Sequence, residues 1–518
     1  MTKKKNLLSI MMTLILAVAM VVTMTAPTFA ENKATDTTIT VPNTDTHTYE
    51  VYQIFTGELS EGVLSNVEWG KNGTGTEGQA VDAAILKALQ DANASGATNT
   101  SKLAVIEKYV NLNSKKFGTV SKDSQLTVKT GYYLLKDVDA NIIGTDTFTK
   151  YVVQVVGPTT ITRKADTPEM EKKVKEKNDS TGVTSDWQDA SDYDIGDDVP
   201  YQISTKIVSN YADYEHYYLS FNDKMEAGLT FNNDVKVFVN GIEVNGFTTV
   251  IGEQAGDYTF VTSCLDITTL IYGEDNRKIK ADDIITVTYS AKLNENAVIG
   301  STGNKNTANM EFSNNPNSTG DGKTKPDNPG KTPDDTVITF TYKTVVNKVD
   351  QDGIALPRAG FTLYKYDDST KDYVLVEKIG VSDATSFTFS GLDAGQYKLS
   401  ETDTPPGYNT IDDILFTIES AWGEEDGMKN LELTSLTVTR GTGAKKVDLT
   451  KGQTPEFTVD ITKTAADAVG NVNTTVKNQK GSTLPSTGGI GTTIFYVIGG
   501  ILVLIAGVLL VTKRRMNK

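Results

Sequence analysis

The sequence is poor in the residues from which disulfides, metal centres and hydrolytic sites are built. Among 518 residues it has one cysteine, Cys264, so an internal disulfide cannot form. The only histidines are His47 and His216, and in the sequence neither stands near a second metal ligand or a nucleophile motif. A zinc centre or a Ser-His-Asp hydrolase therefore has little to be built from, and we expect no metal and no cofactor.

The chain also lacks an excess of positive charge. Its 66 Asp and Glu residues outnumber 50 Lys and Arg residues, which gives a formal net charge of −16. Phosphate backbones repel such a chain, so no nucleic acid is expected as a partner.

The first thirty residues have the pattern of an export signal. Lysines at positions 3–5 precede a largely apolar stretch at 7–22, and small residues follow at 28–30. This order predicts a signal peptide over residues 1–30 that is cut between Ala30 and Glu31. The remaining length corresponds to about three domains of ordinary size.

The other end of the chain combines a short motif, an apolar run and a basic tail. The motif is Leu484-Pro485-Ser486-Thr487-Gly488, and the uncharged run that follows can cross a bilayer as a helix. Its basic tail would stay in the cytoplasm. This order resembles the cell-wall sorting signal of Gram-positive sortase substrates.

That resemblance implies a sorting signal over residues 480–518. Leu484, Pro485, Thr487 and Gly488 would be recognised by a sortase, which cuts after Thr487 and passes its carbonyl to an amine. The precursor would be held in the plasma membrane until that cut and the product would be secreted to the cell wall. A plain C-terminal membrane anchor is the alternative.

Between the two ends the sequence predicts tandem β-sandwiches. Residues 31–163 mix segments rich in Thr, Val, Ile and Tyr with two segments of helical periodicity. Residues 164–313 and 337–479 consist of short strand segments separated by turns, as in immunoglobulin-like sandwiches. Residues 314–336 are rich in Pro, Gly, Asn and Asp and are predicted as a linker. The predicted fold is mainly β: an elongated rod of immunoglobulin-like domains, the first with added helices, and a transmembrane helix in the precursor.

Three polar residues interrupt the inward-facing rows of the third predicted domain. Because side chains alternate along a strand, Lys348, Glu401 and Asn478 each stand where a core residue is expected. Burial lowers the pKa of a lysine and raises that of a carboxyl group. A neutral amine could then attack the asparagine carboxamide while the protonated acid shuttles protons. The expected product is a Lys348–Asn478 isopeptide bond promoted by Glu401.

The second predicted domain repeats this pattern with Lys172, Asp223 and Asn306. Asn304 stands two residues before Asn306, so on a strand both side chains point to the same face, and Asn304 remains an alternative. For both sets the other interpretation is a surface salt bridge, or a strand displaced by one residue, which would turn every side chain outward.

Several segments resemble sortase-assembled pilins. Residues 346–350, 399–402 and 405–408 look like a B-type repeat domain of collagen adhesins and pilins. In that family a lysine after the first strand is joined to an asparagine before the sorting signal, and a glutamate catalyses the reaction. The resemblance implies these roles for Lys348, Asn478 and Glu401.

Residues 49–55, 67–70 and 131–134 look like the first domain of backbone pilins, and the second predicted domain resembles their second domain. In the second domain an aspartate usually takes the catalytic place, which matches Asp223. Backbone pilins also place a lysine that accepts the sortase acyl group at the junction of these domains. Lys164 is the residue at that place, although Thr-Arg-Lys-Ala stands where an aromatic-Pro-Lys-Asn sequence is common.

The resemblance implies the major structural subunit of a covalent pilus that serves adhesion. The expected partners are a pilin-class sortase and a housekeeping sortase, identical subunits, ancillary pilins, and peptidoglycan through its lipid II precursor at the base. Head-to-tail joining does not close and gives a filament. The alternatives are a monomeric wall-anchored adhesin, a minor tip or base pilin and, least favoured, a wall-displayed enzyme. The sequence leaves open the adhesion ligand and any internal bond in the first domain.

Overall fold

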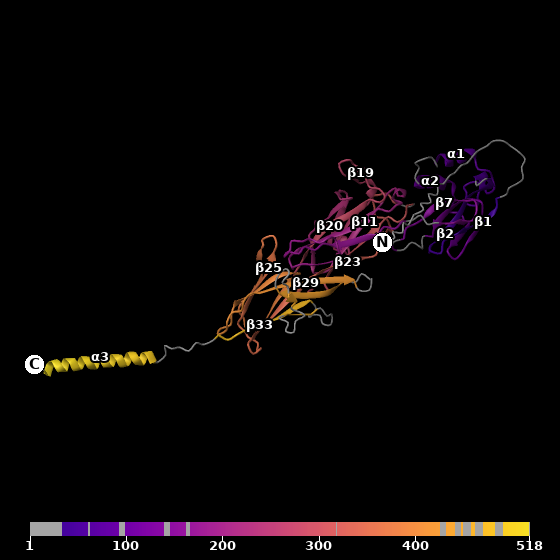
Figure 1. Cartoon of the computed structure of the whole chain (residues 1–518). Coiled ribbons are helices and arrows are strands. Elements are labelled where there is room, and N and C mark those ends of the chain that lie inside the picture. The colour runs from indigo at the N-terminus through magenta and orange to yellow at the C-terminus, as the bar shows by residue number, and fades with distance from the viewer. Residues whose placement is uncertain are drawn as a thin grey trace, which may run out of the picture.

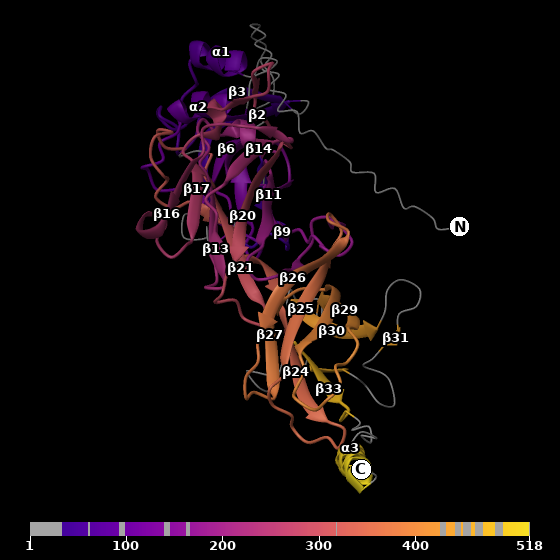
Figure 2. The ribbon, with the colours of Figure 1, turned by 90° about the vertical axis from the view of Figure 1, so that its left-hand side faces the viewer.

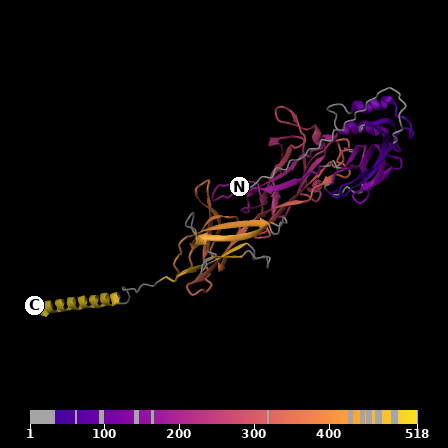
Figure 3. The same ribbon diagram turned by 45° about the vertical axis from the view of Figure 1, so that its right-hand side comes forward.

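The structure, a computed structural model, is an elongated succession of three β-rich domains with a helix at the C-terminal end (Figure 1). The domains follow one another along one long axis, from the indigo first domain to the orange third domain (Figure 3). The predicted mainly β fold class is confirmed. The residues that the structure describes are 34–60, 63–92, 99–138, 144, 146–161, 166–316, 319–424, 431–440, 447–448, 457–460, 470–481 and 491–516.

The first domain packs a three-stranded sheet against a five-stranded sheet, and two helices lie beside the larger sheet. The sheet orders are β5-β1-β8 and β3-β2-β6-β7, with β4 paired to β2. Buried residues such as Val51 and Tyr133 fill the space between the sheets, while Phe55 and Trp69 belong to a second cluster that includes Leu89 of α1. The elements are β1 Asp36–Thr40, β2 Thr48–Ser60, β3 Val63–Trp69, α1 Ala83–Ala92, α2 Asn99–Ile106, β4 Gly118–Ser121, β5 Leu126–Lys129, β6 Gly131–Asp137, β7 Lys150–Val155 and β8 Thr159–Thr160.

The second domain is a sandwich of two larger sheets. Their orders are β10-β23-β21-β12-β17-β16, with β22 on β21, and β15-β14-β20-β11-β9, with β13 on β20. The lone cysteine, Cys264, is buried at the end of β17. The elements are β9 Met170–Val174, β10 Ala190–Asp192, β11 Asp198–Lys206, β12 Leu219–Met225, β13 Leu229–Phe231, β14 Lys236–Val239, β15 Ile242–Glu243, β16 Thr248–Ile251, β17 Phe260–Cys264, β18 Ile271–Tyr272, β19 Arg277–Lys278, β20 Ile284–Leu293, β21 Asn304–Phe312, β22 Gly330–Lys331 and β23 Asp335–Phe340.

The third domain is a sandwich in which the first and last strands lie side by side. β24 and β33 are parallel neighbours in the sheet β27-β24-β33-β32, and the facing sheet has the order β26-β25-β28-β29-β30-β31 (Figure 2). The elements are β24 Tyr342–Asp350, β25 Gly360–Asp367, β26 Asp372–Ile379, β27 Ser386–Leu392, β28 Gly395–Asp403, β29 Ile414–Glu424, β30 Leu431–Arg440, β31 Val447–Asp448, β32 Phe457–Asp460 and β33 Asn471–Asn478.

The segment between the second and third domains is not a simple linker. β22 and β23 both pair with β21, so residues 330–340 belong to a sheet of the second domain. The predicted boundary at residue 337 therefore falls inside β23. Only Thr341 separates β23 from β24, and its side chain is buried. The chain passes from one sandwich to the next almost without interruption.

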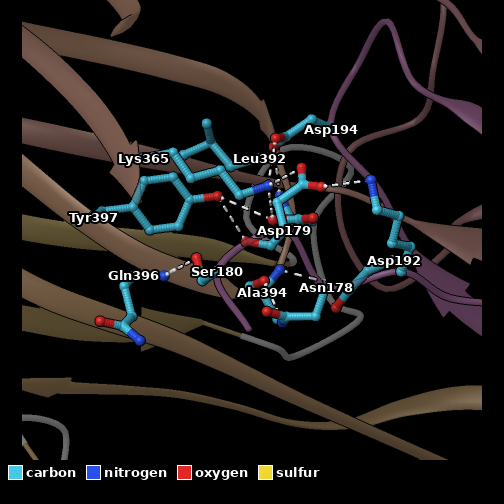
Figure 4. Close-up of polar contacts among 12 residues, drawn as sticks. Asn178, Asp179, Ser180, Asp192, Asp194, Lys365, Leu392, Ala394, Gln396 and Tyr397 are labelled. Atoms are coloured by element: carbon cyan, nitrogen blue, oxygen red, sulfur yellow. Dashed lines mark hydrogen bonds and ion pairs between the residues drawn. The ribbon is translucent and has the colours of Figure 1, made fainter. Parts of the chain in front are cut away.

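A buried polar cluster holds these two domains together. Lys365 of β25 is 7% exposed and lies among three aspartates, two of them from the second domain (Figure 4). Its Nζ is 2.6 Å from Asp194 Oδ2, 2.7 Å from Asp393 Oδ1 and 3.1 Å from Asp179 Oδ2. Burial by itself would lower the pKa of Lys365, but these carboxylates hold it above its ordinary value. Lys365 therefore provides the positive charge that this acidic junction needs.

Two further acids at this junction are buried enough to resist ionisation. Burial, with the charge of Asp192, raises the pKa of Glu176 to about 8. Burial, with the charges of Asp194 and Asp179, raises the pKa of Asp197 to about 6. In the unfolded chain such acids ionise near pH 4. Their contribution to stability is complete below about pH 4 and is lost as the pH rises through the folded-state values.

We therefore expect the mature protein to unfold at a lower temperature at pH 9 than at pH 6, by roughly 5 °C. The reason is that Glu176 must be desolvated as an anion above its folded pKa of about 8. Differential scanning calorimetry over this range measures the effect. Glu176→Gln removes the titration and should flatten the dependence, whereas an unchanged slope in that variant would contradict the assignment.

Candidate functional site

The structure brings Lys348, Glu401 and Asn478 together in the core of the third domain. They come from β24, β28 and β33, and the side chains of Lys348 and Glu401 are fully buried. Asn478 is 0% exposed. The Lys348 Nζ contacts Asn478 Oδ1 closely and lies 3.5 Å from Glu401 Oε1. The three residues that side-chain alternation predicted to face inward therefore form one cluster.

Strand register explains why the lysine reaches the asparagine. Lys348 stands opposite Val476 in the parallel pairing of β24 with β33, and Asn478 is the next inward-facing residue along β33. The Asn478 carboxamide nitrogen donates to both oxygens of Glu401, at 2.9 and 3.0 Å. The Glu401 carboxyl group thus contacts the nitrogen of the Asn478 carboxamide, while the Lys348 amine lies at the oxygen of that carboxamide.

The electrostatics of this cluster favour an uncharged lysine. Burial lowers the pKa of Lys348, and the opposing effect of Glu401 is smaller. The neutral amine is therefore more accessible here than on a solvated lysine. A neutral amine next to a carboxamide and an acid is the arrangement that acyl transfer to nitrogen requires.

The second domain contains a corresponding cluster, formed by Lys172 of β9, Asp223 of β12 and Asn306 of β21. All three residues are 0% exposed. The Lys172 Nζ lies 2.5 Å from Asp223 Oδ2. Burial lowers the pKa of Lys172 and raises the pKa of Asp223, so both shifts favour the neutral pair over the ion pair.

Two tyrosines that the sequence analysis did not single out complete the second cluster. The Tyr289 hydroxyl contacts Lys172 Nζ, donates to Asp223 Oδ2 and accepts from Asn306 Nδ2 at 3.3 Å. The Lys172 Nζ lies 5.1 Å from the ring centre of Tyr289 and 5.3 Å from that of Tyr201. Strand parity could have placed both tyrosines inward, but an inward tyrosine usually indicates core packing and gave no functional signal.

The structure separates the two asparagines that the sequence left as alternatives. The Asn304 carboxamide is held by backbone groups: its oxygen accepts from Val298 N at 2.8 Å, and its nitrogen donates to Val298 O and Thr339 O. Asn306 instead lies beside Tyr289, and its buried oxygen has no hydrogen-bond partner. Asn304 organises a turn, whereas Asn306 bonds to the same Tyr289 hydroxyl that contacts the lysine and the acid.

The described part of the first domain has no comparable cluster, because none of its lysines there is buried. The buried His47 of this domain instead has its Nδ1 2.8 Å from Asp137 Oδ1. In the second domain His216 Nδ1 lies 2.7 Å from Asp266 Oδ2. Each histidine therefore has a carboxylate neighbour 50 or more positions away in sequence. In both cases a ring nitrogen lies at hydrogen-bond distance from a carboxylate oxygen.

Four aspartates at the domain junction are near enough to one another for a cation. They are Asp179, Asp194, Asp197 and Asp393, whose ligand atoms lie within 4.8 Å of one another. The ammonium group of Lys365 already contacts three of them. The described residues thus give this cluster an internal cation.

The predicted processing and joining residues lie outside the described part of the chain. They are Ala30, Glu31, Lys164, Leu484, Pro485, Thr487 and Gly488. The helix that follows the sorting motif is described, as α3 at Gly491–Met516. Its segment Ile494–Arg515 is long and apolar enough to cross a membrane.

Three protein-family models match separate parts of the chain. Residues 195–316 match the Cna-B-like domain of Gram-positive pilin backbone subunits, and residues 343–432 match a prealbumin-like fold domain. Residues 476–518 match the LPXTG cell wall anchor motif. The two domain matches contain Asp223, Asn306, Lys348 and Glu401, and the anchor match contains Asn478.

Among characterised proteins, the chain is similar to the trypsin-resistant surface T6 protein of Streptococcus pyogenes serotype M6. They are 26% identical over 367 residues, which cover 62% of this chain and 65% of that protein. The match thus spans slightly less than two thirds of the relative.

Solved structures with a similar backbone arrangement include two backbone pilins. The T6 backbone pilin of Streptococcus pyogenes is 17% identical, with 88% of this chain and all of that chain covered and a TM-score of 0.48. The major pilin SpaD of Corynebacterium diphtheriae is 16% identical, with 88% and 99% covered and a TM-score of 0.45.

The two domain models, the wall-anchor model and the related surface protein agree with one another and with the order of the domains along the chain. The anchor motif followed by an apolar helix marks a precursor that is held in the membrane and then anchored to the cell wall. The chain thus combines matches to a Gram-positive pilin backbone domain, a prealbumin-like domain and an LPXTG anchor, and this combination supports a sortase-assembled backbone pilin.

Proposed function

We propose that this major pilin forms the shaft of a covalent pilus and that each of its second and third domains closes an internal isopeptide bond. Lys172 would join Asn306, and Lys348 would join Asn478. The observation that carries the proposal is the presence of two fully buried lysines, each in one cluster with an acid and an asparagine. An unreacted buried ammonium is costly, and an amide in its place carries no charge.

The chemistry follows from the contacts in the third domain. Lys348 passes one proton to Glu401, which leaves a neutral amine and a neutral acid. The amine nitrogen attacks the Asn478 carboxamide carbon, and the bond from that carbon to Nδ2 breaks. Glu401 protonates the departing nitrogen and takes back a proton from the attacking one, so that ammonia leaves and Glu401 remains neutral. The 2.9 and 3.0 Å contacts of Glu401 with Asn478 Nδ2 suit this proton delivery.

The bonds would act mainly on mechanical strength. Each closes a loop of about 130 residues, which in the chain-entropy model stabilises a domain by roughly 4 to 5 kcal/mol. In the third domain the bond joins the first strand, β24, to the last strand, β33. Tension that enters at one strand and leaves at the other would pass through the covalent bond rather than through the strand hydrogen bonds.

Polymerisation would use the sorting signal as the acyl donor. A pilin-class sortase would transfer the Thr487 carbonyl to Lys164 of the next subunit, and a housekeeping sortase would join the basal subunit to the lipid II precursor of peptidoglycan. In the sequence the acceptor Lys164 stands between the first and second domains, and the donor Thr487 follows the third. Repetition therefore gives a head-to-tail filament.

Intact-mass spectrometry tests the internal bonds. Each bond removes one ammonia, so the mature ectodomain should be lighter than its sequence mass by two losses of about 17 Da each. Asp223→Ala and Glu401→Ala should each restore one of the two losses.

The asparagines provide a matched pair for this measurement. Asn306→Ala should abolish the loss in the second domain, whereas Asn304→Ala should retain it, because the carboxamide of Asn304 is bound by backbone groups. An ectodomain of unshifted mass would rule out both bonds.

Immunoblotting of wall extracts boiled in detergent tests the polymer. The native chain should give a ladder of covalent multimers, and Lys164→Ala should reduce it to a single band because the acceptor amine is gone. Lys177→Ala is the matched control, since this lysine is solvent-exposed and, like Lys164, stands near the start of the second domain in the sequence. A ladder that persists in Lys164→Ala would exclude that lysine, and a single band for the native chain would indicate an anchored adhesin or a minor pilin.

A further inference from the structure

The two lysine clusters differ in how the acid meets the asparagine. In the third domain Glu401 accepts two hydrogen bonds from the Asn478 nitrogen. In the second domain the acid is Asp223, whose side chain is one methylene shorter. Its Oδ2 contacts Lys172 and Tyr289, and its buried Oδ1 has no hydrogen-bond partner. Within this described cluster no hydrogen bond joins Asp223 to Asn306.

Tyr289 fills the interval between that acid and the carboxamide. Its hydroxyl donates to Asp223 Oδ2 and accepts from Asn306 Nδ2, so a single oxygen links the two groups. The same oxygen contacts the Lys172 amine. Every group that must exchange a proton during bond formation in this domain therefore meets at the Tyr289 hydroxyl or at Asp223.

The position of that hydroxyl is fixed by packing. Tyr289 lies on β20, an inner strand of its sheet, and is paired directly with Tyr201 of β11. Its ring stacks on Tyr201 at 5.5 Å and meets Phe260 edge-on at 4.8 Å. The side chain is thus held by aromatic neighbours in a fully buried site, which favours a defined role over a chance contact.

We propose that Tyr289 is a catalytic proton relay, which carries a proton from Asp223 to the departing nitrogen of Asn306 as the Lys172–Asn306 bond forms. This inference rests on the proposed bond in the second domain. No relay is needed in the third domain, where Glu401 contacts the corresponding nitrogen itself.

The proton movements balance. Lys172 passes a proton to Asp223 across their 2.5 Å contact and becomes a neutral amine. The amine attacks the Asn306 carbon, and Tyr289 gives its hydroxyl proton to Nδ2 while it takes the proton of Asp223. The carbon–Nδ2 bond breaks, ammonia leaves, and the attacking nitrogen returns one proton to Asp223. Tyr289 ends as it began, as a neutral phenol.

The properties of the buried Tyr289 phenol suit the role of a proton relay better than the role of a general base. Burial and the nearby Asp223 raise the pKa of Tyr289 well above its ordinary value, so its hydroxyl keeps a proton throughout the physiological range. A group that stays protonated can pass a proton on only if it receives another at the same time. The two hydrogen bonds of Tyr289 provide that path.

Tyr289→Phe in the full mature protein tests the relay. Peptides that contain the Lys172–Asn306 link should accumulate about 100-fold more slowly or be missing, as expected for loss of a general acid-base group. The Lys348–Asn478 link in the same molecules should be complete. Digestion and mass spectrometry of samples taken from the first hour of purification over several days measure both links. Complete Lys172–Asn306 linkage in the first sample of this variant would overturn the relay.

Tyr193→Phe is the matched control, because it removes a hydroxyl from the core of the same domain that donates to the backbone oxygen of Lys175 rather than to the acid. It should retain the Lys172–Asn306 link, and equal losses in both variants would overturn the assignment to Tyr289. Native protein without this link would overturn the proposed bond itself, which distinguishes that failure from failure of the relay.

A double variant covers the case in which Tyr289→Phe acts only through packing. Adding Asp223→Glu lengthens the acid by one methylene, so that it should reach Asn306 as Glu401 reaches Asn478. The double variant should regain the link that Tyr289→Phe loses. A folded double variant that does not regain it would contradict the relay.

Discussion

The constraint on which the structure depends is the burial of a lysine ammonium between the strands of a sandwich. Lys172 and Lys348 are both 0% exposed, and removing such a charge from water is tolerated only with a close partner. Each therefore requires an acid, and the acid in turn favours the neutral form of the pair. Conversion of the amine to an amide would remove the charge altogether, so folding itself would drive the proposed chemistry.

The same residue types serve a different purpose where the environment differs. At the junction of the second and third domains Lys365 is surrounded by aspartates, and its charge is reinforced rather than suppressed. In the cores of the second and third domains an acid faces a buried lysine, and the shift of the lysine pKa is in the opposite direction. The number of carboxylates around the amine thus separates an ionic contact between domains from a reactive amine within a domain.

Much of the fold and site could be predicted because alternation along a strand is a local property. The inward parity of Lys348, Glu401 and Asn478 can be followed in the sequence without knowledge of the partner strands. The mainly β class and the C-terminal apolar helix follow from composition and length in the same way. Domain limits were harder, since β23 looks like the start of the third domain but pairs with β21 of the second.

The sequence by itself determined which residues face inward, where the membrane segment lies and which residue types are available for chemistry. Only the tertiary structure decided which of them meet. Tyr289 lies 117 positions from Lys172 in the chain, and strand parity alone cannot show that their atoms touch. Parity likewise could not separate Asn304 from Asn306, because both side chains are buried and only the neighbouring strands and turns distinguish them. The physical reason is that contacts between strands depend on register and sheet packing, which long-range interactions set.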